Sequence, residues 1–101
     1  MKTNRPRWLL VLTLCLAALC SLSAHAEAPV ILVLGDSLSA GYGIPVERGW
    51  VSLLQRRLTE RGFPHRVVNA SISGDTTGGG LSRLPATLER DRPAIVILEL
   101  G

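Results

Sequence analysis

The sequence predicts an α/β fold in which a parallel sheet carries helices on its faces. Two observations lead to this class. Short apolar runs, nearly continuous in Val, Ile and Leu, recur at residues 29–34, 66–70 and 94–98. Continuous runs of this kind are typical of strands buried on both faces. Helical patterns occupy the intervals between the runs, and strands that alternate with helices form parallel sheets.

The first run, residues 29–34, stops abruptly at Gly35 and is followed by small polar residues. A helix is expected next, from about Trp50 to a stop at Gly62, because a glycine commonly follows the last turn of a helix. Apolar residues recur at helical spacing along one side of it, at Trp50, Val51, Leu54 and Leu58. This pattern predicts an amphipathic helix with Trp50 in the core.

The interval between the second and third runs indicates a helix less clearly. Apolar residues hold helical spacing there, at Leu81, Leu84 and Leu88. Pro85 lies among them, and proline suits the first turn of a helix. We therefore expect a short helix from Pro85 to about Asp91, ended by Arg92 and Pro93. The three glycines at 78–80 are expected to form a flexible loop.

The first 26 residues have the organisation of a secretory signal peptide. Basic residues open the chain at Lys2, Arg5 and Arg7. An apolar run over residues 8–20 follows, and Ala24-His25-Ala26 has the small-x-small pattern of a cleavage site. The run is shorter than the roughly 20 residues that cross a bilayer. We therefore prefer cleavage after Ala26 to retention as a membrane anchor.

Removal of residues 1–26 changes the composition of what remains. The leader carries three of the 11 basic residues, so eight basic residues balance eight acidic ones and nothing indicates a nucleic-acid partner. Cys15 and Cys20 leave with it, which excludes a disulfide or a cysteine metal site. The remaining 75 residues, 27–101, end directly after an apolar run. We expect them to be the N-terminal part of a longer domain.

Ser37, directly after the first predicted strand, is the candidate for chemistry. The loops at the carboxyl ends of parallel strands share one edge, where ligands bind. Ser37, Gly74 and Gly101 are therefore expected at that edge. The residues alone leave three interpretations open. Ser37 or Ser39 could cap a helix, the turn could bind an anion, or Ser37 could be a nucleophile whose own N–H faces an oxyanion.

The three loops resemble the sequence blocks of the SGNH, or GDSL-type, serine hydrolases. "GDSLSAGYGI" at residues 35–44 is similar to the family's first block, whose serine is the nucleophile. "NASISGDTT" at 69–77 looks like the second block, and "VILELG" at 96–101 looks like the run into the third, G-x-N-D. The nearest branch is the periplasmic thioesterase, lysophospholipase and arylesterase group.

This resemblance implies a flavodoxin-like three-layer α/β/α fold that is incomplete in this chain. It implies Ser37 as the nucleophile, the N–H groups of Ser37 and Gly74 as oxyanion-hole donors, and acyl esters, thioesters or lysophospholipids as substrates, with no metal or cofactor required. The third-block Asn and the D-x-x-H block lie beyond Gly101, so we expect the chain alone to be inactive. His65 precedes the second strand, at the opposite edge, and is not expected to replace the missing base.

Two acidic and two apolar residues near Ser37 also carry expectations. Asp36 should shape the turn through hydrogen bonds to the backbone, and Asp75 should cap the next segment. Tyr42 and Ile44 either line an acyl pocket or pack. Two alternatives to an esterase stay open. One is a flavodoxin-like module that binds phosphate at residues 35–39, and the other is a catalytically inactive relative that binds lipid or sugar.

Overall fold

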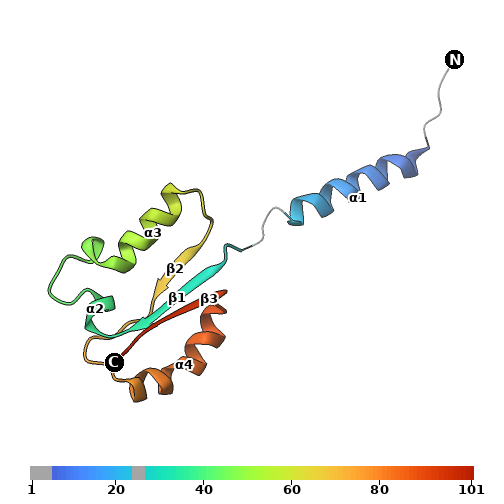
Figure 1. The fold of residues 1–101 in the computed structure, drawn as a ribbon. Helices are drawn as coiled ribbons and strands as arrows, with labels where there is room; N and C mark the ends of the chain where they lie inside the picture. The colour runs from blue at the N-terminus through green and yellow to red at the C-terminus, as the bar shows by residue number, and fades with distance from the viewer. Residues whose placement is uncertain (1–5, 24–26) are drawn as a thin grey trace.

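The computed structural model describes residues 6–23 and 27–101, and the second range forms a sheet between helices. Strands β1 (Val30–Gly35), β2 (Arg66–Asn69) and β3 (Ile95–Glu99) run parallel in the order β2-β1-β3. Helix α3 (Trp50–Glu60) covers one face and α4 (Thr77–Asp91) covers the other (Figure 1). The predicted α/β class with a parallel sheet is confirmed, and the strands begin and end within one residue of the predicted runs.

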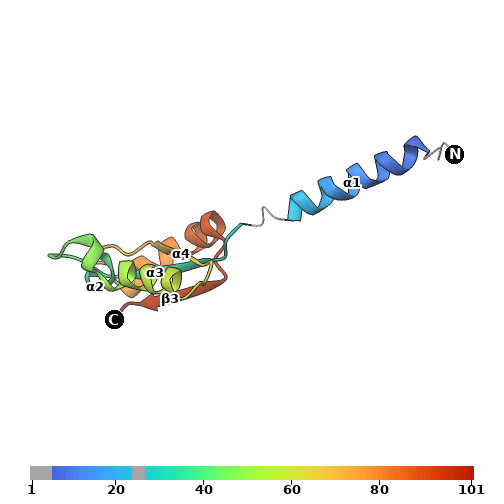
Figure 2. The same ribbon diagram turned by 90° about the horizontal axis from the view of Figure 1, so that it is seen from above.

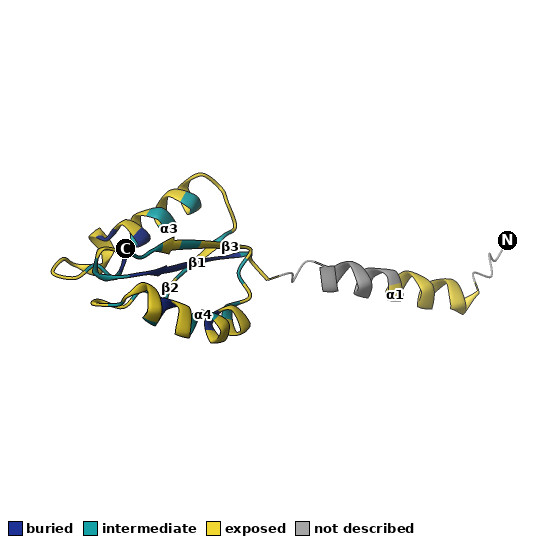
Figure 3. Cartoon of the chain, turned by 60° about the horizontal axis from the view of Figure 1, so that its bottom comes forward, coloured by how far each residue is buried: buried dark blue, intermediate teal, exposed yellow. Residues whose placement is uncertain are grey.

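The core of the molecule is the central strand β1. All six of its residues are buried, and Leu32, Val33 and Leu34 are almost completely removed from solvent. Figure 3 shows why, since β1 lies in the middle of the sheet with α3 above and α4 below. Burial of one such side chain stabilises a fold by about 1.5–3 kcal/mol. The predicted burial on both faces is therefore confirmed for this strand.

The outer strands are more exposed than their apolar composition predicted. Ile95, Val96 and Leu98 of β3 are exposed, and none of the four residues of β2 is buried. Among the described residues, each outer strand pairs at one edge only, with β1. The prediction that all three strands are buried on both faces is wrong for β2 and β3, because a continuous apolar run does not reveal whether a second neighbour covers it.

Helix α3 has the predicted extent but not all of the predicted packing. It ends at Glu60, and Gly62 follows with φ 78°, the left-handed conformation that glycine adopts readily. Val51 is buried on the face toward the sheet. The prediction that Trp50 belongs to the core is wrong, since it remains 36% exposed at the first position of the helix.

Helix α4 corrects two predictions about its region. The glycine tract is not a loop but lies in the first turns of the helix, and Pro85 does not begin a helix but lies inside one. Thr76 caps the helix, since its Oγ1 accepts a hydrogen bond from the Gly79 N–H at 3.1 Å. A proline in a helix interior costs about 3 kcal/mol. Packing against the sheet, where Thr87 is buried, offsets this cost.

Gly80 explains why the tract is helical. It is buried, and a Cβ at this position would collide with the side chain of Leu100 and touch that of Leu34. The absence of a side chain therefore lets the first turns of α4 lie directly against the ends of β1 and β3. The tract is a packing surface, which local sequence patterns do not distinguish from a flexible loop.

The N-terminal helix α1 (Arg7–Ser23) stands apart from the sheet (Figure 2). Its side chains are exposed from Arg7 to Cys15, and Trp8 and Leu14 are among them. None of the helices among the described residues combines the length and apolar character needed to span a membrane. The predicted cleavage site at residues 24–26 lies outside the described residues.

Candidate active site

Ser37 lies in the turn that follows the central strand. β1 ends at Gly35, and Ser37 is the first residue of the short helix α2 (Ser37–Ala40). Asp36 caps this helix, because its Oδ1 accepts a 3.0 Å hydrogen bond from the Leu38 N–H. The expectation that Asp36 shapes the turn is confirmed. The interpretation of Ser37 or Ser39 as the cap is wrong.

The hydroxyl and the N–H of Ser37 have no hydrogen-bond partner among the described residues. As the first residue of a helix, Ser37 has no intrahelical acceptor for its N–H. Among the described residues, neither this N–H nor the Ser37 hydroxyl makes a hydrogen bond, and the residue is half-buried. A residue with an unpartnered hydroxyl and N–H therefore lies at the carboxyl edge of the sheet.

Ser39 fixes the turn to the elements around it. It is 2% exposed, its Oγ donates to Glu99 Oε1 at 2.7 Å, and its Oγ accepts from Trp50 Nε1 at 3.1 Å. Its backbone carbonyl accepts from Asn69 Nδ2 at 2.8 Å. Glu99 ends β3 and Asn69 ends β2, so one buried serine joins the carboxyl ends of all three strands. Sequence analysis missed this set, although Asn69 and Glu99 both stand at predicted strand ends.

Gly35 makes the contact between Ser39 and Glu99 possible. A Cβ on Gly35 would lie 2.7 Å from Ser39 Oγ and 3.0 Å from the backbone oxygen of Glu99. Any larger residue would push the Ser37 turn away from β3. The glycine of the G-D-S sequence is therefore required by close packing.

The loop after β2 returns to the Ser37 turn. The Ile72 N–H donates to the Gly35 carbonyl at 3.0 Å, and a tight turn closes where the Asp75 N–H donates to the Ile72 carbonyl at 3.1 Å. Gly74 occupies the third position of this turn with φ 82°, a conformation that favours glycine. Its N–H has no acceptor among the described residues. The prediction that Ser37, Gly74 and Gly101 lie at one edge is confirmed, since Gly101 comes two residues after the end of β3, which is parallel to β1.

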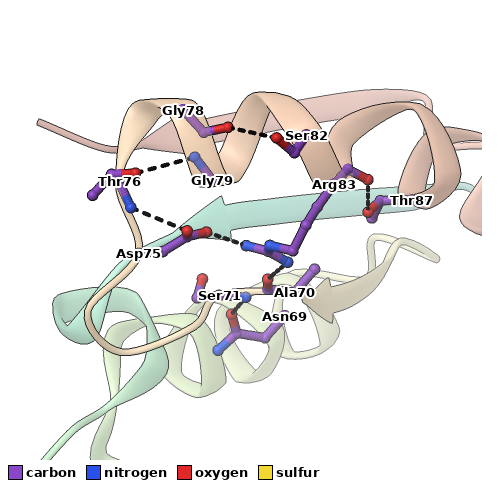
Figure 4. A network of polar contacts seen from close by, with 10 residues as sticks. All are labelled: Asn69, Ala70, Ser71, Asp75, Thr76, Gly78, Gly79, Ser82, Arg83 and Thr87. Atoms are coloured by element: carbon purple, nitrogen blue, oxygen red, sulfur yellow. Dashed lines mark hydrogen bonds and ion pairs between the residues drawn. The ribbon is translucent and has the colours of Figure 1, made fainter.

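An ion pair holds the far end of this loop (Figure 4). Arg83 on α4 pairs with Asp75 at 2.6 Å and also donates to the Ala70 carbonyl at 2.9 Å. The hydrogen bond from Arg83 lowers the pKa of Asp75 below its ordinary value. The expectation that Asp75 caps the next segment is wrong, because Thr76 is the residue that caps α4.

The other candidate residues lie away from this edge or in solvent. As expected, His65 precedes β2 at the amino edge of the sheet. Its ring lies 6.1 Å from that of Phe63. Tyr42 and Ile44 are exposed, so neither packs in the core that the described residues form. Within the part of the chain that the structure describes, no cluster of His, Cys, Asp or Glu could hold a metal ion.

An apolar hollow of about 220 Å³ opens between α4 and the ends of β1 and β3. Its walls include Leu34, Leu84, Leu98 and Leu100. Neither Ser37 nor Gly74 lines it. The hollow therefore lies near the carboxyl ends of these strands but does not include the two predicted site residues.

The fold and this edge define a class of protein, the α/β proteins that carry a serine in the turn after the first strand of a parallel sheet. The chain belongs to the GDSL-like lipase/acylhydrolase family, whose model matches residues 33–101.

Three curated relatives are similar over most of this chain. Esterase TesA of Pseudomonas aeruginosa is 55% identical over 92 residues, which are 91% of this chain and 45% of the relative. An arylesterase of Vibrio mimicus is 52% identical over 92 residues, 91% of this chain and 44% of the relative. Thioesterase 1/protease 1/lysophospholipase L1 of Escherichia coli K12 is 49% identical over 76 residues, 75% and 35% of the two chains. The chain thus spans less than half the length of these relatives.

Solved structures show the same fold. The crystal structure of TesA has a TM-score of 0.71 at 58% identity and covers 71% of this chain, with 40% of that chain covered. Esterase EstA from Pseudoalteromonas, in a structure inhibited by monoethylphosphonate, has a TM-score of 0.67 at 51% identity, with coverage of 71% and 39%. AlinE4, an SGNH-hydrolase family esterase, has a TM-score of 0.68 at 42% identity, with coverage of 75% and 41%. The fold class predicted from the resemblance is confirmed.

Proposed function

We propose that the protein containing this sequence is an exported serine esterase that hydrolyses acyl esters, thioesters or lysophospholipids, with Ser37 as its nucleophile. The observation that carries this proposal is the free hydroxyl and N–H of Ser37 at the carboxyl edge, beside the Gly74 turn. The names of the relatives, which include esterase, arylesterase and thioesterase, favour this range of substrates.

The proposed reaction uses the Ser37 hydroxyl as the attacking group. Its Oγ adds to the acyl carbonyl carbon, and the N–H groups of Ser37 and Gly74 donate to the oxygen that becomes negative. The alcohol or thiol then leaves with a proton, and water releases the acyl group from Ser37 as a carboxylic acid. No step requires a metal or an organic cofactor.

The general base must come from outside these 101 residues. A serine hydroxyl is a weak nucleophile at its ordinary pKa and reacts only beside a base. His65 is at the opposite edge of the sheet, before β2. We therefore assign the catalytic His and Asp, and an Asn that completes the oxyanion hole, to segments beyond Gly101.

The charges around the turn oppose the phosphate-binding alternative. The turn at residues 35–39 contains the carboxylate of Asp36 and contacts that of Glu99, and both would repel a phosphate. An inactive relative that binds lipid or sugar would share the fold. It would differ from the proposed esterase because its Ser37 would not react.

We propose export on two grounds, the sequence pattern of residues 1–26 and the exposure of the described side chains of α1, the helix within them. An apolar helix whose described side chains are exposed adds nothing to the core, as expected for a segment that is removed. We propose cleavage after Ala26, which leaves a domain that begins at Glu27 in the periplasm with no lasting membrane anchor.

The proposal is tested in the complete protein with a p-nitrophenyl acyl ester. Ser37→Ala should lower kcat by about 10⁴–10⁶, the range found when a single member of a serine triad is removed. Ser52→Ala is the matched control, since Ser52 is also half-buried but lies on α3, and it should keep wild-type turnover. A Ser37→Ala variant with most of its turnover would refute the proposal.

A second experiment uses residues 27–101 alone. We expect no turnover that depends on Ser37, because the base and one oxyanion donor are missing. Residues 27–101 and their Ser37→Ala version should therefore hydrolyse the ester at the same background rate. A difference between them would show that a base lies within these residues.

A further inference from the structure

We propose that Arg83 is a positioning residue of the oxyanion hole, and that its guanidinium clamps together the two ends of the loop that carries Gly74. This inference rests on the proposed function, because it concerns how the Gly74 N–H is held for the same reaction. Arg83 lies nine residues after Gly74 in the sequence, on the helix that follows the loop.

The clamp consists of two hydrogen bonds from one side chain (Figure 4). Arg83 Nη1 donates to the carbonyl of Ala70 at 2.9 Å, and Nη2 donates to Asp75 Oδ2 at 2.6 Å. Ala70 is the first residue of the loop after β2, and Asp75 directly follows Gly74. A planar guanidinium can hold two such acceptors in a fixed geometry, which a lysine ammonium cannot do.

Other contacts fix the first half of the loop to β1, whereas the second half is held by the turn hydrogen bond from the Asp75 N–H to the Ile72 carbonyl and by this clamp. The Ala70 N–H donates to the Val33 carbonyl at 2.8 Å and the Ile72 N–H donates to the Gly35 carbonyl at 3.0 Å, so the loop is attached to β1 as far as Ile72. Gly74 itself is exposed and has no side chain to anchor it. Its position therefore depends on Asp75, the next residue along the chain.

Asp75 is well placed to transmit this restraint. Its side chain is only 11% exposed, and its Oδ1 also accepts the Thr76 N–H at 3.0 Å. Thr76 in turn caps α4. The pair with Arg83 lowers the pKa of Asp75, so the carboxylate is charged at neutral pH. The loop end, the helix start and the guanidinium thus form one connected unit.

The same helix offers a matched control. Arg90 pairs with its neighbour Asp91 at 2.8 Å near the end of α4. The Arg90 side chain is 64% exposed, and among the described residues its hydrogen bonds go only to Asp91, not to the Gly74 loop. An exposed pair of this kind contributes little to stability. Removal of Arg90 therefore changes the charge of α4 without changing the clamp.

Loss of the clamp should act on the transition state more than on substrate binding. The Gly74 N–H is proposed to bond the oxyanion, which forms only during the reaction. Removal of one oxyanion donor lowers kcat by about 10²–10³. A donor that is present but poorly held should cost less, so we expect Arg83→Met to lower kcat by about 10–100-fold with KM changed less than about twofold.

The experiment uses the complete protein and a p-nitrophenyl acyl ester, with kcat expressed per reactive serine titrated by a fluorophosphonate. This normalisation removes any effect of a misfolded fraction. Arg83→Lys should recover part of the lost kcat, since it keeps the charge opposite Asp75 but cannot bond both acceptors. Arg90→Met should match the wild type. If Arg83→Met is not obtained folded, Asp75→Asn breaks the same ion pair and should show the same fall in kcat.

The outcomes separate this inference from the proposed function. Wild-type kcat per reactive serine in Arg83→Met or Asp75→Asn would overturn the positioning role, and so would an equal fall in Arg90→Met. In those cases an inactive Ser37→Ala variant would leave the proposed function standing. Full activity in Ser37→Ala would instead refute the proposed function itself.

Discussion

The hydroxyl of Ser39 donates a 2.7 Å hydrogen bond to the carboxylate of Glu99, 60 residues further along the chain. Ser39 lies two residues after the proposed nucleophile, and Glu99 ends β3. The bond ties the Ser37 turn to the strand that leads into the third sequence block of the family. The geometry of the proposed nucleophile therefore depends on a contact between distant parts of the sequence.

Replacement of Ser39 by alanine should destabilise the protein. It leaves Glu99 Oε1 and Trp50 Nε1, whose contacts with Ser39 are partly buried, without their partner, and an unsatisfied polar group costs about 1–3 kcal/mol when it is buried. Ser82→Ala is the control, since Ser82 is exposed on α4 and bonds only within its own helix. Urea unfolding of the complete protein should show the larger loss for Ser39→Ala. Equal losses would contradict the structural role of Ser39.

Gly80 and Gly78 should respond in opposite ways to alanine. A Cβ on Gly80 would force the end of the Leu100 side chain to move, so Gly80→Ala should lower the free energy of unfolding by about 0.5–1.5 kcal/mol. A Cβ on Gly78 meets only Thr76 Oγ1 at 3.8 Å, so Gly78→Ala should leave stability unchanged or raise it by up to about 1 kcal/mol. Denaturant midpoints compare the two. A Gly80→Ala variant as stable as Gly78→Ala would show that α4 does not pack closely on the sheet.

The Asp75–Arg83 pair should make stability depend on acid pH. The folded protein lowers the pKa of Asp75 below its ordinary value of 3.8, mainly through the hydrogen bond from Arg83. The stability that this pair contributes is therefore complete above the unfolded pKa and is lost as the pH falls through the folded pKa. The wild type should be more stable than Asp75→Asn at pH 7, and the difference should shrink below pH 3.8. A difference that stays constant or grows in acid would contradict the assignment.

The leader prediction is tested by the mass of the exported protein. Cleavage after Ala26 should give a mature protein whose first residue is Glu27. Ala26→Arg should block cleavage, because signal peptidase requires a small residue at this position. Intact-mass analysis of the periplasmic fraction distinguishes the forms. An exported protein that retains Met1 would show that residues 1–26 are not a cleavable leader.

The parts of the fold that follow from local patterns were predictable from the sequence. The apolar run of β1 and the glycine that follows α3 are local sequence patterns, and they predicted the strand and the end of the helix. Helix α4 was not predictable in the same way. Pro85 and the glycine tract argue against a helix locally, whereas the packing of Gly80 against the side chains of Leu34 and Leu100 depends on the sheet and favours one.

The candidate site, like the fold, was predictable from the sequence only in part. The edge that holds Ser37 and Gly74 followed from the predicted parallel arrangement of the strands and from the resemblance, because both residues lie in loops that follow strand ends. The restraints on that edge did not follow. The partner of Ser39 is 60 residues away, and the double contact of Arg83 with Ala70 and Asp75 depends on how α4 lies on the sheet.

The most direct test of the account is to identify the residue that a fluorophosphonate modifies in the complete protein. The reagent should form one covalent adduct, on the peptide that contains Ser37, and peptide mass spectrometry locates it. Ser37→Ala should give no adduct, and Ser52→Ala should be modified like the wild type. An adduct on any other residue, or a folded wild-type protein that does not react, would contradict Ser37 as the nucleophile.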